Sequence, residues 1–190
     1  MNLPDILHHT DYVALPTLLL DTLRDDLDWE RRSDAPRGEY YVNDSGAPYT
    51  YGRGRGVRTY LSKSWHPYML SLRVGLEKYL STGPLDACFL NRYENERDHL
   101  GWHADDSPEM DHARPIAVIS LGAERDLEFR PKGGTQAVHR VHLTNGSLLV
   151  MPAGMQRDWE HRIGKSSSKC GLRISLTYRG FVKPATPGAP

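Results

Sequence analysis

Residues 172–179 read LRISLTYR, and this short segment near the end of the chain decides the fold. It has the composition of a β-strand, and Arg173 and Arg179 are six positions apart. Because side chains alternate between the two faces of a strand, an even separation places both arginines on the same face. We therefore expect a strand that directs two guanidinium groups toward one place.

Other short apolar segments, each bounded by turn residues, precede this strand from residue 86 onward. We expect strands at residues 87–93, 115–121, 127–129, 138–143 and 147–151. Repeated short strands without helical patterns between them favour an antiparallel sandwich or barrel over an α/β fold with a parallel sheet. The predicted fold is mainly β with flanking helices, as a double-stranded β-helix (jelly roll).

Two amphipathic helices are predicted before these strands. Leucines recur every four residues between positions 19 and 27, after Pro16, which is the spacing of one helix face. A second helical pattern covers residues 66–82, with Pro67 near its start and Gly83 as its stop. We expect both helices to cover a face of the sheet.

The segment between the helices, residues 31–60, is rich in glycine, arginine and tyrosine. Tyrosine-rich runs at 40–42 and 49–51 flank a turn-forming Asn43-Asp44-Ser45-Gly46, which predicts a β-hairpin. The charge changes sign here: residues 1–30 carry seven acids and one base, whereas residues 31–63 carry seven bases and three acids. We expect a basic surface on the hairpin, although the formal net charge is zero.

The length of 190 residues is usual for one soluble domain. We expect residues 1–182 to form it, with the hairpin at about 31–60, the jelly-roll core at about 86–180, and a disordered proline-rich tail at 183–190. No apolar stretch is long enough for a membrane span, and the N-terminus lacks a signal-type pattern. We expect a cytoplasmic monomer without a membrane partner, in which both cysteines are structural thiols.

Three residues are candidate metal ligands. His103 and Asp105 are one residue apart, so an extended chain directs both side chains to one face, and His161 follows within Trp159-Glu160-His161-Arg162. Two histidines and one carboxylate that leave three metal positions open are the ligand set of non-haem iron(II) oxygenases. Solvated or structural histidines are the alternative, since the chain has nine histidines.

The two arginines of residues 172–179 suggest that an anionic co-substrate fills the open metal positions. An arginine directed into an interior needs an anionic partner, which a dicarboxylic co-substrate supplies through a bidentate pair. Asn91 and Tyr93 alternate on another predicted strand and could hydrogen-bond a carboxylate. Structural salt bridges for the arginines, and a satisfied polar pair in the core for Asn91 and Tyr93, are the alternatives.

From about residue 29 to 180 the chain resembles the AlkB family of nucleic-acid dealkylating dioxygenases, especially the DNA-repair members with a hairpin lid. The resemblance is carried by Pro36-Arg37, Tyr49-Thr50-Tyr51-Gly52, Leu90-Asn91-Arg92-Tyr93, residues 98–106 (DHLGWHADD), residues 119–122 (ISLG), residues 146–151 (GSLLVM), residues 159–162 (WEHR) and residues 173–179. It implies Fe(II) bound by His103, Asp105 and His161, with dioxygen as oxidant. It further implies that Arg173 pairs with the distal carboxylate of 2-oxoglutarate. Arg179 would complete the co-substrate pocket with Asn91 and Tyr93, and it would also be a catalytic residue, as would the three metal ligands.

The same resemblance implies the contacts to substrate. Asp106 would face the alkylated base, and Tyr49 and Tyr51 look like lid aromatics that enclose a flipped base. Trp29 lies where relatives probe the duplex, although it also ends a predicted helix and could belong to the core. The arginines expected to contact phosphates are Arg31, Arg32, Arg37, Arg53, Arg55 and Arg58, with a solvated charged loop as the alternative.

The implied function is oxidative dealkylation of N1-methyladenine and N3-methylcytosine in alkylated DNA, a repair reaction that releases formaldehyde, succinate and carbon dioxide in the cytoplasm, nucleoid or nucleus. Two departures bear on it: Ser175 replaces the family asparagine, and Ser107 follows Asp106 where some relatives carry a second acid. Co-substrate affinity and substrate preference could differ as a result. The alternatives are an oxygenase of the same fold that acts on RNA, a protein or a small molecule, and a non-catalytic nucleic-acid-binding module.

Overall fold

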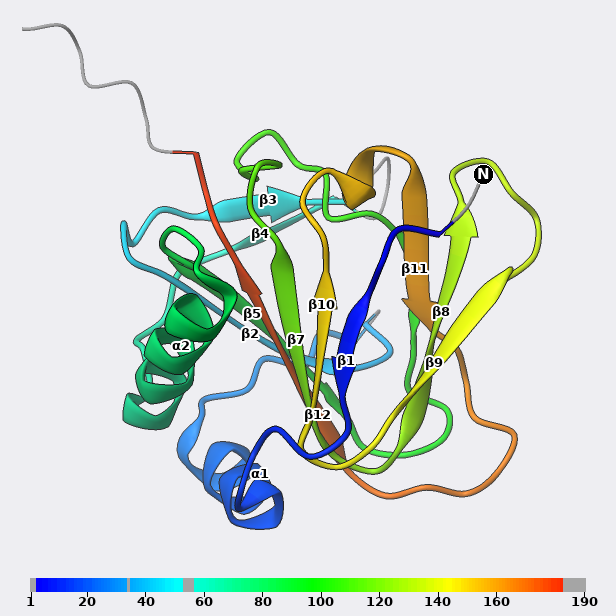
Figure 1. Ribbon diagram of the computed structural model, residues 1–190. Helices are drawn as coiled ribbons and strands as arrows, with labels where there is room; N and C mark the ends of the chain where they lie inside the picture. The colour runs from blue at the N-terminus through cyan, green and yellow to red at the C-terminus, as the bar shows by residue number, and fades with distance from the viewer. Residues whose placement is uncertain (1–2, 34, 53–56, 183–190) are drawn as a thin grey trace, which may run out of the picture.

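The computed structural model describes residues 3–33, 35–52 and 57–182. In chain order its elements are β1 (Leu7–His9), α1 (Pro16–Asp26), β2 (Gly38–Asn43), β3 (Tyr49–Tyr51), β4 (Arg58–Tyr60), α2 (Pro67–Leu80), β5 (Ala87–Tyr93), β6 (Leu100–His103), β7 (Ile116–Gly122), β8 (Arg125–Pro131), β9 (His139–Leu143), β10 (Ser147–Met151), the 3-10 turn Met155–Arg157, β11 (Trp159–Ile163) and β12 (Arg173–Arg179) (Figure 1).

Two antiparallel sheets form the body of the protein. The larger has six strands in the order β1-β10-β7-β12-β5-β2, and the smaller has four in the order β6-β11-β8-β9. Apolar side chains of both sheets, among them Val118 and Met151 of the larger and Phe129 and Ile163 of the smaller, form one buried cluster between them. The predicted mainly β jelly roll is confirmed, and the strands predicted at 87–93 and 147–151 have the observed bounds.

Both helices cover the outer face of the larger sheet (Figure 1). Their buried residues, such as Leu23 of α1 and Leu76 of α2, pack in one cluster with Ile174, Leu176 and other apolar residues of the sheet. The alternation of β12 thus turns its apolar residues toward the helices and its polar residues toward the smaller sheet. Both predicted helices are confirmed, with α2 slightly shorter than expected.

The end of α2 differs from the prediction because Ser81 caps the helix before Gly83 is reached. Ser81 adopts a left-handed conformation with φ of 47°, and its backbone N–H donates to the carbonyls of Glu77 and Lys78. A residue in this conformation cannot continue a right-handed helix, so the helix ends at Leu80.

The predicted hairpin between residues 40–42 and 49–51 is wrong in its pairing. β2 pairs with β5 at the edge of the large sheet, with Tyr41 opposite Phe89, and β3 pairs instead with β4. All six residues of β2 are buried, because helices cover one face of the strand and the β3–β4 hairpin covers the other. Burial on both faces therefore outweighed the local turn signal.

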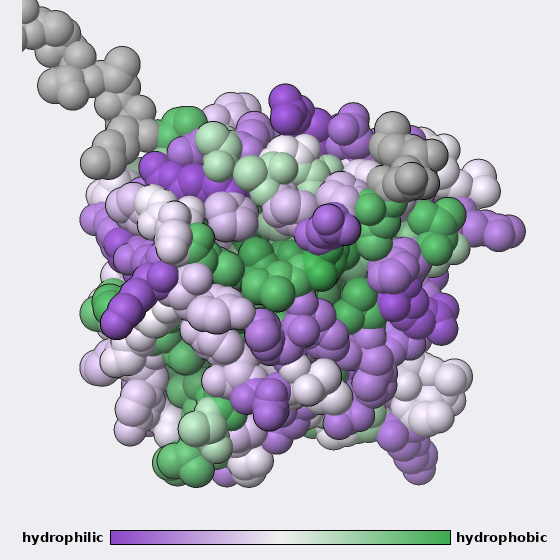
Figure 2. All heavy atoms as spheres, viewed as in Figure 1, coloured by the Kyte–Doolittle hydropathy of each residue, from purple (hydrophilic) through white to green (hydrophobic). Residues whose placement is uncertain are grey.

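Some expectations fall outside the described part of the chain, namely those for Arg53, Arg55 and residues 183–190. Over residues 3–33, 35–52 and 57–182, no helix is both long and apolar enough to cross a membrane. Cys88 and Cys170 are both free. Figure 2 shows a largely hydrophilic face, with apolar side chains gathered across its middle and at the lower left, where α1 lies. Leu18 of α1 and the preceding Leu15 are exposed by 58% and 66%.

Candidate metal centre

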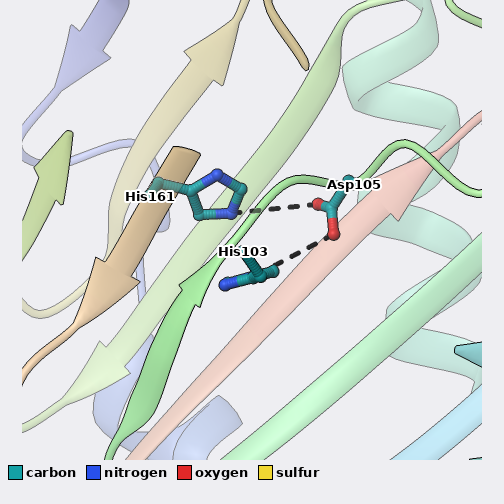
Figure 3. A group of neighbouring side chains, drawn as sticks. All are labelled: His103, Asp105 and His161. Carbon is teal, nitrogen blue, oxygen red and sulfur yellow. Dashed lines mark ion pairs between the residues drawn. The ribbon is translucent and has the colours of Figure 1, made fainter. Parts of the chain in front are cut away.

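The three predicted metal ligands converge between the two sheets. One potential ligand atom from each of His103, Asp105 and His161 lies within 4.8 Å of the others. Figure 3 shows the Asp105 carboxylate facing both imidazoles from one side, with one oxygen 3.9 Å from His103 Nε2 and the other 4.0 Å from His161 Nε2. This spacing allows one ion to contact all three groups.

Strand pairing produces this convergence. His103 ends β6 and stands directly opposite His161 on β11, so the two rings are neighbours across the ladder, with centroids 4.2 Å apart. Asp105 follows on the loop after β6, and its backbone N–H donates to Oε1 of the buried Gln156 over 2.9 Å. The side chain of Gln156 therefore fixes the loop that carries the carboxylate.

Both histidines are held in the form that binds metal. Burial lowers the pKa of His161 to about 3, and it also lowers the pKa of His103, so both imidazoles are neutral at neutral pH. His103 Nδ1 lies 2.9 Å from the carbonyl oxygen of Gly101, which can only accept, so the proton sits on Nδ1. The Nε2 lone pair of His103 is left for a metal.

Asp105 is ionised and only half satisfied. Burial alone would raise its pKa, but the Arg179 guanidinium and the two histidines outweigh burial, and the pKa is lowered. One carboxylate oxygen accepts from Arg179 over 2.8 Å, while Oδ2 is buried without a hydrogen-bond partner. A buried, ionised oxygen beside two neutral imidazoles is the donor set that a divalent iron ion requires.

The predicted co-substrate residues line one small cavity together with the ligands. Its walls include Asn91, Tyr93, Arg173, Ser175 and Arg179. Arg173 is 1% exposed; its Nε donates to Ser120 Oγ over 3.0 Å, and its Nη1 is buried without a hydrogen-bond partner. Such a cation is costly to bury without an anion, so the cavity has the charge that a carboxylate-bearing ligand would complete.

Comparison with known proteins identifies the fold family. The family model described as "2OG-Fe(II) oxygenase superfamily" matches residues 23–179. The chain belongs to this superfamily. The AlkB resemblance is also confirmed by relatives, since the chain is 33% identical over 189 residues to the human "Alpha-ketoglutarate-dependent dioxygenase alkB homolog 3", with 90% of this chain and 63% of that protein covered.

A second human relative, "DNA oxidative demethylase ALKBH2", is 32% identical over 154 residues, which cover 77% of this chain and 57% of that protein. The chain thus spans about 60% of the length of these curated relatives. A solved structure titled "The structure of OsALKBH1" superposes with a TM-score of 0.66 at 14% identity, covering 95% of this chain and 98% of that one. That likeness supports the fold.

A larger cavity of about 680 Å³ opens beside the metal centre of this superfamily member. His103 and Tyr51 line it, and their rings meet edge to face with centroids 6.2 Å apart. Asp106 also lines it, where its carboxylate pairs with Lys132 over 2.7 Å. Tyr51 and Asp106, two of the residues expected to contact substrate, therefore line the same cavity as His103.

Two predicted substrate contacts do not line the larger cavity in this structure. Tyr49 is 1% exposed and packs between Tyr51 and Tyr60, because the β3–β4 pairing turns its ring onto the sheet. Its ring packs against Tyr51 and, with His103, lines a small cavity of about 20 Å³ instead of the larger one. Trp29 packs against the helix-side core and donates its indole N–H to the Leu23 carbonyl, so the structure favours the core alternative for it.

Of the arginines expected to contact phosphates, those that the structure describes are engaged within the protein. Arg37 is 7% exposed; it pairs with Glu39 over 2.7 Å, and its Nε donates to the Asn91 amide oxygen over 2.5 Å. It therefore fixes the amide of Asn91, which lines the small cavity. The other described arginines also pair with acids: Arg31 with Asp98, Arg32 with Glu30 and Arg58 with Glu39.

Several residues of the site were missed from the sequence. Ser120 accepts a hydrogen bond from Arg173 and stands opposite Ser175 in the ladder, a face that the alternation of the predicted strand could have shown. Gln156 lies five residues before His161, but no local pattern marks it as a partner of Asp105. Arg125, buried beside Tyr93, and Lys132 owe their positions to the pairing of the smaller sheet, which the sequence did not predict.

Proposed function

We propose that this chain is an Fe(II)- and 2-oxoglutarate-dependent oxygenase that removes alkyl groups from nitrogen atoms of nucleic-acid bases. The observation that carries the proposal is a single buried cavity that joins two neutral imidazoles, an ionised and half-satisfied carboxylate, and an arginine without an acidic partner among the described residues. The imidazoles and the carboxylate would bind iron, and the arginine would bind a carboxylate of 2-oxoglutarate.

The roles of the residues follow from this geometry. His103, Asp105 and His161 would hold the iron, and Arg173 would pair with the distal carboxylate of 2-oxoglutarate. Iron, 2-oxoglutarate and dioxygen together supply the oxidation of a C–H bond, with succinate and carbon dioxide as co-products. Arg179 holds the Asp105 carboxylate by its 2.8 Å contact and keeps it ionised, so that the ligand is ready for a cation.

Hydrogen-bond donors complete the co-substrate cavity. Asn91 receives the Arg37 Nε–H at its amide oxygen, which turns the amide NH₂ to the other side of the group. Its donors and the Tyr93 hydroxyl would serve the co-substrate carboxylates. Ser175, buried in the same wall, offers one hydroxyl donor where the family strand has an amide.

The substrate would enter the larger cavity. A volume of about 680 Å³ accommodates one extruded base with its sugar, and Tyr51 and Trp102 in its wall offer aromatic faces for stacking. An N-methyl group directed past Tyr51 would reach the metal side at His103. The names of the relatives support demethylation of nucleic acid as the class of reaction, with N1-methyladenine and N3-methylcytosine in DNA as the proposed bases.

The decisive experiment measures formaldehyde and succinate released from methylated oligonucleotides in the presence of Fe(II). DNA and RNA, single- and double-stranded, are compared with a reaction without nucleic acid. We expect product from the wild-type protein and none from Asp105→Ala. Succinate without formaldehyde from any oligonucleotide would point to another substrate class, and no iron-dependent succinate would favour a binding module.

A second experiment separates base binding from co-substrate turnover. Tyr51→Ala should lower demethylation about tenfold or more, as loss of one stacking contact does, while succinate release without nucleic acid changes little. Tyr68→Ala is the matched control, because Tyr68 is half exposed on α2, away from the residues that line either cavity. Equal loss of both activities in Tyr51→Ala would count against a role in base binding.

A further inference from the structure

A salt bridge stands in the wall of the larger cavity. Lys132 Nζ lies 2.7 Å from Asp106 Oδ2, and the side chains are exposed by 31% and 28%. Both residues line the cavity that also contains His103 and Tyr51. Asp106, the acid that follows Asp105 in the chain, is therefore already paired with a cation before any substrate enters.

Backbone hydrogen bonds fix the chain around both partners of this salt bridge. Lys132 directly follows β8, and its backbone N–H donates to the Asp158 carbonyl over 2.8 Å. A tight turn follows, closed by a 2.9 Å hydrogen bond from Gly134 N–H to the Pro131 carbonyl. Because Asp106 is attached to the loop that Gln156 fixes, the pair does not depend on two freely moving side chains alone.

Charge compensation extends to the other described acid in the cavity wall. Glu160 lines the same cavity and pairs with Arg130 over 2.8 Å. Each acid of the wall thus has a cation of its own, and a positively charged base entering the cavity meets compensated carboxylates. Because a carboxylate with a cation at 2.7 Å attracts a second cation less than the same carboxylate does once that cation is removed, the salt bridge weakens selection for charge.

We propose that Lys132 is a specificity-determining residue, which by pairing with Asp106 lets the cavity accept neutral alkylated bases as well as positively charged ones. The inference rests on the proposed function and concerns the choice among bases only. Lys132 acts through Asp106 and takes no part in the oxidation.

The test compares two substrates that differ in charge but have similar shape. N3-methylcytosine is a cation and N3-methylthymine is neutral, and both are placed at the same position of one single-stranded DNA oligonucleotide. The quantity measured is the ratio of kcat/KM for the cationic base to kcat/KM for the neutral base. Both oligonucleotides carry the same phosphates, so a change in backbone binding cancels in this ratio.

Four variants decide the outcome. Lys132→Met keeps the length of the side chain and removes its charge, and we expect it to raise the ratio about tenfold, which is about 1.4 kcal/mol of discrimination. Lys132→Arg keeps the charge and should keep the wild-type ratio within about twofold. Lys165→Met removes one lysine charge from an exposed position that lines a different cavity, and it should also leave the ratio unchanged. The double variant Lys132→Met with Asp106→Asn should return the ratio to the wild-type value.

An unchanged ratio in Lys132→Met, or the same rise in Lys165→Met, would overturn the inference while the proposed function stands. A rise that persists in the double variant would also overturn it, because the effect would then not pass through Asp106. If the wild-type protein demethylates neither oligonucleotide although it turns over 2-oxoglutarate, the proposed function fails, and this inference fails with it.

Discussion

Replacing Arg173 by methionine should make the metal-free, ligand-free protein more stable and remove its response to 2-oxoglutarate. Arg173 is buried to 1% exposure, burial lowers the pKa of its guanidinium, and its Nη1 has no hydrogen-bond partner. Apolar side chains that replace buried ionic groups stabilise proteins by about 1–4 kcal/mol. We expect about 2 kcal/mol, which for a chain of this length raises Tm by about 4–8 °C.

The assay is thermal unfolding of the metal-free protein, and of the protein with Mn²⁺ in place of iron, with and without 2-oxoglutarate. At a ligand concentration about 100 times Kd, the wild-type protein should gain about 2.7 kcal/mol, and Arg173→Met should gain nothing. Arg125→Met is the matched control: Arg125 is also buried, but its guanidinium donates to the carbonyls of Asp98 and Gly164. Its loss should destabilise the protein by about 1–3 kcal/mol. A lower Tm for Arg173→Met without ligand, or a retained 2-oxoglutarate shift, would refute the reasoning.

Three further predictions concern stability. Glu39→Gln should lower the free energy of unfolding by about 3 kcal/mol in urea titrations, because it leaves the buried Arg37 without the anion it pairs with; a loss below about 1 kcal/mol would show that the ion pair is weak. Gly122→Ala should cost at least about 2 kcal/mol, since Gly122 has φ of 84° and a Cβ would lie 2.3 Å from the Leu172 carbonyl oxygen, whereas Gly171→Ala, with open space around it, should change stability little; similar losses for both would contradict the strain argument. The destabilisation caused by Asp98→Asn should be large at about pH 7 and shrink at about pH 3. Burial alone would raise the pKa of Asp98, but hydrogen bonds from Arg31 and the Glu94 backbone lower it below 3.8, so its contribution is present above that value and is lost as the pH falls through the lowered pKa; a pH-independent difference between Asp98→Asn and wild type would contradict this assignment.

Features encoded by one segment at a time were predictable from the sequence. The arginine spacing of residues 173–179 anticipated a polar face on β12, and the apolar runs at 87–93 and 147–151 gave strands with the correct bounds. The short separation of His103 and Asp105 gave two of the three converging groups. Each of these signals depends on local periodicity, which strand geometry imposes directly.

Features that depend on which segments meet were not predictable in the same way. β6 is four residues long and contains a glycine, so its sequence carries little strand signal, and its partner β11 is 56 residues away. The alternating burial of β11 places His161 on the same face as the apolar Trp159 and Ile163, a period of two that could have been noticed. The ion pairs that engage Arg31 and Arg58 join segments far apart in the chain, and no spacing rule announces them.

The position of β6 has a consequence for handling the protein. β6 is an edge strand of the four-stranded sheet, and its register with β11 is irregular just beyond the His161–His103 pair. A metal ion bound by both histidines would link β6 to β11 and stabilise this edge of the sheet. Removal of the ion by a chelator would let β6 separate from β11. The unpaired backbone groups of the edge would then be exposed to other chains and to proteases. Iron loading should therefore govern shelf life and self-association of the purified protein, and preparations stripped of metal are the ones to keep cold and dilute.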